Sequence, residues 1–189
     1  LCNRLDAPTA GILIFAEEEQ AARAVKSAFQ KQRVEKVYLA AVKGVPAQPS
    51  GSWEDALLIK KQGGKIRTHR QGTAPTSRGK MARTEFQVLE KQETFGKTVS
   101  LLRLHPKTGR SHQLRVQTSQ RGLPILGDKT YGDFELNKYL RKTEGIRQLL
   151  LHAYSIRIPF TNTEHPDFTA QTKLPDWVLD HFSYREENL

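Results

Sequence analysis

The chain has 189 residues, a formal net charge of +10 at pH 7 and a sequence pI of about 9.8. This length suits one domain with its own hydrophobic core. The single cysteine, Cys2, excludes an internal disulfide and a cysteine metal cluster. No apolar run approaches the roughly 20 residues of a membrane-spanning helix, and no signal peptide is visible. These features predict a cytoplasmic protein that does not enter a membrane.

The basic excess is uneven along the chain. Residues 56–127 hold fifteen Lys and Arg side chains against three Glu, so the remainder of the chain is slightly acidic. Such a concentration is typical of a nucleic-acid-binding surface, although an ordinary solvated basic surface is the simpler alternative. The charge pattern therefore favours a nucleic acid as the partner.

The N-terminal part of the sequence predicts three strands and one helix. The apolar run 12–16 is typical of a buried strand, and it follows a turn built from Asp6, Pro8 and Gly11. Residues 17–32 are predicted to form the helix, because apolar residues recur at helical spacing from Ala21 to Phe29. Further strands are predicted over 34–42 and 53–59, with a loop containing Pro and Gly over 45–52.

Residues 60–80 have a different composition, with seven Lys and Arg, five Gly or Pro, and no acid. Because such a segment has little with which to build a core, we predict a mobile basic hairpin or loop. Beyond it, the patterns predict strands over 83–90, 98–104 and 149–160, and helices over 111–120, 133–143 and 174–182. The chain is therefore predicted to be α+β and rich in antiparallel strand pairs.

Several familiar catalytic patterns are absent from the sequence. Gly96-Lys97-Thr98 is similar to the end of a phosphate-binding loop, but the first glycine of that motif would fall on Lys91. No serine lies in G-x-S-x-G, the nucleophile elbow of α/β-hydrolases. The six histidines form no H-x-x-x-H pair, and Ser111 and His112 are neighbours only in sequence. Neither a metal site nor a serine–histidine dyad is therefore predicted.

Four segments together resemble the RluA-type RNA pseudouridine synthases over nearly the whole chain. They are N-R-L-D-A-P-T-A-G at 3–11 with the apolar run after it, E-K-V-Y-L-A-A-V-K-G at 35–44, L-H-P-K-T-G-R-S-H-Q-L-R-V at 104–116, which continues to G-L-P-I-L-G-D at 122–128 and Tyr131-Gly132, and L-L-L-H-A at 149–153. Two departures are visible, because the family usually has His at the position of Asn3 and Ser at that of Ala10.

The resemblance implies an α+β fold, with a mixed, mostly antiparallel sheet, flanking helices and a central RNA-binding cleft. It implies an enzyme that isomerises uridine to pseudouridine in structured ribosomal or transfer RNA, by breaking the N-glycosidic bond and rejoining the sugar to C5. No metal, small-molecule cofactor or membrane is implied, and we expect a monomer. Residues 1–189 would be the catalytic domain without its first strand, without the lysine-proline-glycine motif that the family has upstream, and without any upstream RNA-binding domain.

Three residues are the predicted catalytic group. By resemblance, Asp6 is the nucleophile, Arg115 holds it charged, and Tyr38 stacks on the uracil and assists removal of the C5 proton. Each residue also has a simpler interpretation, namely a turn cap for Asp6, a surface position for Arg115 and a core position for Tyr38. The alternative function is a non-catalytic RNA-binding domain with the same fold, and the presence of all three residues opposes it.

Six further residues are predicted to bind the RNA substrate. By resemblance, Arg4 enters the RNA stack as the target nucleotide leaves, although a simple phosphate contact is the alternative. Leu151 is predicted to line the base pocket. The other four residues are Lys107, Arg110, His112 and Gln113. They lie in one segment, which is expected to contact phosphates.

Overall fold

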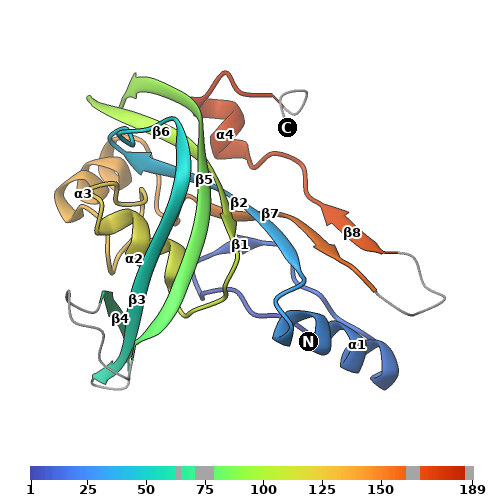
Figure 1. The fold of residues 1–189 in the computed structure, drawn as a ribbon. Helices are drawn as coiled ribbons and strands as arrows, with labels where there is room; N and C mark the ends of the chain where they lie inside the picture. The colour runs from blue at the N-terminus through green and yellow to red at the C-terminus, as the bar shows by residue number, and fades with distance from the viewer. Residues whose placement is uncertain (63–64, 71–78, 161–166, 186–189) are drawn as a thin grey trace.

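The computed structural model describes residues 1–62, 65–70, 79–160 and 167–185. In this part of the chain it contains one eight-stranded sheet and four helices (Figure 1). In chain order the elements are β1 (Ala10–Gly11), α1 (Glu19–Gln30), β2 (Glu35–Lys43), β3 (Ser50–Gln62), β4 (Lys65–Arg70), β5 (Lys80–Thr94), β6 (Lys97–Pro106), α2 (Gln113–Ser119), α3 (Phe134–Thr143), β7 (Leu151–Ile158), β8 (Phe168–Gln171) and α4 (Asp176–His181).

The sheet follows the order β1-β7-β2-β6-β5-β3-β4, with β8 pairing to β7. The pairing of β1 with β7 is parallel, and each of the other strand pairs is antiparallel. β3 pairs with β4 and β5 pairs with β6, so in both cases strands that follow each other in the chain are antiparallel neighbours. The predicted α+β class with a mixed, mostly antiparallel sheet is therefore confirmed.

The core lies on both faces of the central strands. On β2, Leu39 and Ala41 belong to the cluster that packs against α3 and α4, whereas Ala40 and Val42 belong to the cluster that includes Leu114 of α2. Because successive strand residues point to opposite faces, a strand that is apolar at every position is buried on both sides. Figure 1 shows α2 and α3 near one end of the sheet and α1 near the other.

Most predicted elements are confirmed, with shifts of a few residues at their ends. Strands β4 and β8 were not predicted, because their short sequences carry little apolar periodicity. Within 60–80, β3 extends to Gln62 and β4 pairs with it, so this segment is a hairpin where it is described. Residues 63–64 and 71–78 of the predicted basic segment lie outside the described residues.

The prediction of a strand over 12–16 is wrong, since only Ala10 and Gly11 before it pair in the sheet. The Ile12 amide still donates to the Ala153 carbonyl (3.1 Å), but the chain then turns to its own N-terminal residues. The Ile14 amide donates to Oδ1 of Asn3 (2.8 Å), and the Cys2 amide donates to the Ile14 carbonyl (2.8 Å). A side-chain amide thus takes the place of a neighbouring strand and ties residues 2–3 to the sheet edge.

β1 lies so close to β7 that position 11 has no space for a side chain. Gly11 has a φ of +117°, and a Cβ there would lie 2.3 Å from the Ala153 carbonyl oxygen. We expect Gly11→Ala to lower the free energy of unfolding by more than about 2 kcal/mol, because backbone strain and a backbone clash add. The control Gly96→Ala has φ +65° with nothing within 4 Å, and should cost only about 1 kcal/mol. Urea denaturation compares the two, and equal losses would contradict the close packing of β1 on β7.

None of the helices in the described residues is long and apolar enough to cross a membrane.

Candidate active site

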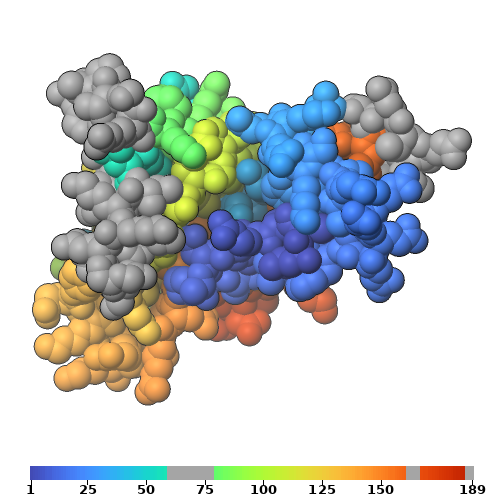
Figure 2. All heavy atoms as spheres, turned by 90° about the horizontal axis from the view of Figure 1, so that it is seen from below, coloured from blue at the N-terminus to red at the C-terminus, as the bar shows by residue number. Residues whose placement is uncertain are grey.

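A cavity of 520 Å³ opens where the N-terminal segment, β2, β7 and the segment before α2 meet. This volume is within the range of pockets that hold small ligands. Its lining includes Asp6, Tyr38, His112 and Leu151, which come from four different segments. In the space-filling view (Figure 2), the dark blue N-terminal residues lie across the middle of one face, beside the yellow atoms of the segment that leads into α2. The fold thus brings the four sequence blocks to one place.

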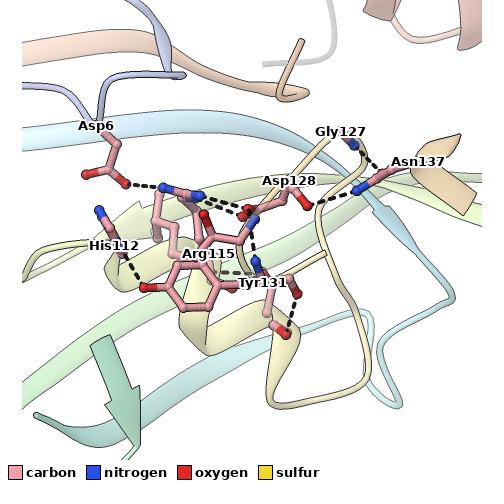
Figure 3. A network of polar contacts seen from close by, with 11 residues as sticks. Asp6, His112, Arg115, Gly127, Asp128, Tyr131 and Asn137 are labelled. Atoms are coloured by element: carbon pink, nitrogen blue, oxygen red, sulfur yellow. Dashed lines mark hydrogen bonds and ion pairs between the residues drawn. The ribbon is translucent and has the colours of Figure 1, made fainter. Parts of the chain in front are cut away.

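Asp6 is placed in the cavity by a tight turn. The Thr9 amide donates to the Asp6 carbonyl (2.8 Å), which closes the turn through Ala7 and Pro8 before β1 begins. The Asp6 side chain is 24% exposed, and its Oδ2 lies 3.5 Å from Nη1 of Arg115. The predicted ion pair between Asp6 and Arg115 is therefore present, while the carboxylate stays accessible from the cavity (Figure 3).

Arg115 is held mainly by a carboxylate that sequence reasoning did not single out, Asp128. The Arg115 Nε and Nη2 atoms donate to the two Asp128 oxygens at 2.8 and 2.7 Å. Both side chains are almost fully buried, at 4% and 0% exposure. Such a two-pronged pair fixes the plane of the guanidinium group. Arg115 therefore reaches Asp6 with its remaining nitrogen and from a fixed position (Figure 3).

Asp128 is itself fixed by the turn that follows it. Burial alone would raise the pKa of this carboxyl, but hydrogen bonds from Arg115 and from the amides of Thr130 and Tyr131 hold the pKa below its usual value. The Asn137 amide nitrogen donates to the Asp128 carbonyl (2.8 Å). A sequence signal for this residue existed, because a buried arginine requires a carboxylate partner and Asp128 ends one of the blocks that resemble the family.

Tyr38 lies on β2 beside a bulge in β7, where the register of the two strands shifts between Val37 and Tyr38 and passes over Tyr154 of β7. The bulge re-aims the strand beside the site. Burial, and to a lesser extent the Asp6 charge, raises the pKa of Tyr38 to about 12. The phenol is therefore neutral at physiological pH. Leu151, 3% exposed, lines the same cavity, so an aromatic ring and an aliphatic side chain are available to flank a planar base.

His112 connects the cavity to the buried pair. It has a left-handed backbone (φ 55°) just before α2, and its Nδ1 lies 2.7 Å from the Tyr131 hydroxyl. The Tyr131 ring is in turn 5.1 Å from the Arg115 guanidinium carbon. Burial lowers the pKa of His112, and the Arg115 charge lowers it further, against the raising effect of Asp6 and Asp128. Because this pKa lies below the ordinary value of 6.5, the His112 side chain is mainly neutral at pH 7.

This arrangement predicts a measurable link between Asp6 and His112. Because the Asp6 carboxylate raises the pKa of His112, Asp6→Asn should lower that pKa below its wild-type value. Proton NMR titration of the imidazole signals, with His112→Gln to identify the resonance, measures the change. The pKa of His152, which burial lowers and for which no neighbouring charge contributes, should stay the same in Asp6→Asn. An unchanged or raised pKa of His112 would contradict the geometry.

The remaining residues that were predicted to bind substrate differ in whether they line the cavity. Arg4 is exposed and Arg110 half-buried, and both line the cavity. Lys107 does not line it, and its Nζ instead contacts Glu85 at 2.8 Å.

Gln113 lies at the cavity wall, but its side chain is used inside the protein. Its Oε1 accepts hydrogen bonds from the Thr108 hydroxyl and the Arg110 amide, and its Nε2 donates to the Arg83 carbonyl and the Thr84 hydroxyl. The Gln113 side chain therefore holds the 108–110 loop, and its predicted contact with the substrate stays a prediction.

Within the described residues, no group of three or more His, Cys, Asp and Glu is placed to hold a metal ion. The cavity wall also contains a lysine that sequence reasoning did not select, Lys36. It stands two residues before Tyr38 in the same sequence block, so its position next to a candidate site residue was the available signal.

Comparison with known proteins shows the family to which this chain belongs. Residues 1–120 match the family model described as RNA pseudouridylate synthase. From Haemophilus ducreyi, a ribosomal large subunit pseudouridine synthase C is 33% identical over 187 residues (96% of this chain, 52% of the relative), and a tRNA pseudouridine synthase C is 35% identical over 165 residues (80% and 63%). The solved structure of human RNA pseudouridylate synthase domain containing 1 matches with a TM-score of 0.78 and 31% identity, over 92% of this chain and 68% of that one.

The chain thus spans about half to two thirds of the length of these curated relatives. The family model covers more than half of the chain, and it includes the turn with Asp6, the strand with Tyr38 and the helix with Arg115. The sequence resemblance, the fold and the comparisons agree, and the chain belongs to the RNA pseudouridylate synthase family, as one of its RluA-type members.

Proposed function

We propose that this chain isomerises uridine to pseudouridine in structured RNA, with Asp6 as the nucleophile. The observation that carries the proposal is the position of Asp6, whose carboxylate faces a cavity and the buried Arg115–Asp128 pair while remaining open to a ligand. A nucleophile of this kind needs a positioned carboxylate in a partly shielded site. The names of the two Haemophilus relatives support ribosomal or transfer RNA as the substrate class.

The reaction needs the base to leave the RNA stack and enter the cavity, which costs a few kcal/mol. Arg4, which is exposed and lines the cavity, would then occupy the vacated position or hold a neighbouring phosphate. Tyr38 and Leu151 would then flank the uracil, and the hydrogen-bonded 108–110 loop would border it.

The chemistry balances without an added reactant. The N1–C1′ bond breaks, the uracil turns, and a C5–C1′ bond forms, after which C5 loses its proton and N1 carries one. Asp6 would attack either C1′ of the ribose or C6 of the base, and either route regenerates the free carboxylate. The neutral phenol of Tyr38 positions the ring at the start of the reaction, since a group with a pKa of about 12 holds its proton.

The direct test is release of tritium from RNA that was transcribed without modification and carries 5-tritiated uridine. We expect the wild-type chain to release tritium in proportion to the pseudouridine formed, which is scored independently by nucleoside chromatography. A chain that binds the RNA in a salt-sensitive manner but releases no tritium and forms no pseudouridine would contradict the proposal. That result would support the alternative of a non-catalytic RNA-binding domain.

A further inference from the structure

Lys36 is a half-buried cation in the wall of the same cavity. It lies on β2 and lines the cavity together with Asp6 and Tyr38. Its Nζ lies 3.4 Å from the Thr108 carbonyl oxygen, and no carboxylate among the described residues is within ion-pair distance of it. By contrast, Lys43 and Lys107 contact Asp133 and Glu85 at 2.6 and 2.8 Å. Lys36 is therefore a cation at the site that lacks a protein counter-ion among the described residues.

The half-buried position of the Lys36 ammonium group is energetically unfavourable in the protein without RNA. Burial lowers the pKa of Lys36 from 10.5 to about 8, with no opposing contribution from a neighbouring acid. An ammonium group withdrawn from water ordinarily needs a partner charge and hydrogen-bond acceptors. Lys36 has one acceptor at 3.4 Å, the backbone carbonyl of a loop that Gln113 holds in place. The group is thus oriented by the protein but not neutralised by it.

The anion that enters this cavity with a nucleotide is a backbone phosphate. A base that reaches the space between Asp6 and Tyr38 brings its own ribose and the two phosphates attached to it. Lysine is a compact point charge with three donors, which suits a phosphate oxygen without requiring one fixed geometry. We propose that Lys36 binds a phosphate adjoining the target nucleotide and so positions the ribose over Asp6. This inference rests on the proposed function, because it assumes that a nucleotide occupies the cavity.

The first experiment measures binding alone, by fluorescence anisotropy of a labelled stem–loop RNA with a single loop uridine, over a series of potassium chloride concentrations. We expect Lys36→Met to weaken binding on the order of tenfold and to reduce the slope of log affinity against log salt by about 0.7, the value of one single-strand phosphate contact. Lys36→Arg should keep the wild-type slope. The control is Lys91→Met, which removes an exposed lysine of β5. Lys91 pairs with Ser100 of β6, which in turn pairs with Val42, near the end of β2 that lies away from Lys36. This change should alter neither the affinity nor the salt slope.

The second experiment removes the charge from the RNA. Two versions of the same stem–loop are made, each with a single neutral methylphosphonate linkage. The linkage lies on the 5′ side of the uridine in one version and on the 3′ side in the other. At one of the two linkages, the wild type should lose as much affinity as Lys36→Met loses on the unmodified RNA, and Lys36→Met should lose little more. An unchanged salt slope in Lys36→Met, or equal methylphosphonate losses in both proteins, would overturn the inference.

Failure of the inference and failure of the proposed function are distinguishable, because binding is measured without turnover. Tritium release by the wild type tests isomerisation, and salt slopes test Lys36. A positioning role also predicts that Lys36→Met lowers kcat under saturating RNA and that Lys36→Arg restores most of it. A purely structural role would instead lower thermal stability and leave the salt slope at its wild-type value.

Discussion

Asp6→Asn should abolish tritium release, with a fall in the single-turnover rate of at least about 10⁴-fold. The amide has the size of the carboxylate but cannot attack carbon and then leave again. The cavity and the Arg115–Asp128 pair do not depend on Asp6, since both Asp128 oxygens are bound by Arg115 independently of it. We therefore expect RNA affinity and the free energy of unfolding to stay near the wild-type values.

The matched control is Asp180→Asn, which removes the same charge from an exposed position on α4. It should release tritium at the wild-type rate. If Asp6→Asn kept more than about one hundredth of the wild-type rate, another group would be the nucleophile, and the central assignment of the site would be wrong. If it lost affinity in step with its rate, the role of Asp6 would be to bind the substrate.

Asp128→Ala should be the most destabilising single change in the site, with a loss of about 3–5 kcal/mol in the free energy of unfolding. It leaves the buried Arg115 without its main partner and removes the acceptor for the Thr130 and Tyr131 amides. Urea denaturation measures the loss. Activity should also fall in the fraction that stays folded, because Arg115 would no longer be held in position beside Asp6.

A double variant separates the charge from the packing. Arg115→Met alone leaves the Asp128 carboxylate buried without its cation and should also destabilise strongly. Arg115→Met with Asp128→Leu removes both charges and should be less destabilised than the sum of the single changes. The control Asp133→Ala removes a partly exposed carboxylate that contacts Lys43 and caps α3, and should cost about 1 kcal/mol. Additive losses at Arg115 and Asp128 would contradict a strongly coupled pair.

Local sequence patterns predicted most of the strands and helices, whereas the central residues of the site were predicted from the resemblance to a known family. The turn with Asp6, the strand with Tyr38 and the helix with Arg115 each lie within one uninterrupted motif. Their elements follow from turn chemistry and from apolar periodicity, which act over a few residues. These same motifs carry the resemblance to a known family. That resemblance predicted that Asp6 and Arg115 would meet, although 109 positions separate them.

Features that depend on distant partners were decided only by the tertiary structure. Residues 12–16 have the composition of a strand, but the Ile14 amide donates to the side chain of Asn3 and not to a neighbouring strand. Asp128 and Lys36 acquire their roles from burial, one with Arg115 as its partner and the other with no counter-ion among the described residues. Lys107 was predicted to contact a phosphate, and only the tertiary structure shows that its Nζ lies 2.8 Å from Glu85 of the neighbouring strand β5. In each case the free energy of a polar group depends on the burial and the partners that it acquires on folding. The sequence identifies the polar group, but not the distant residues that will surround it.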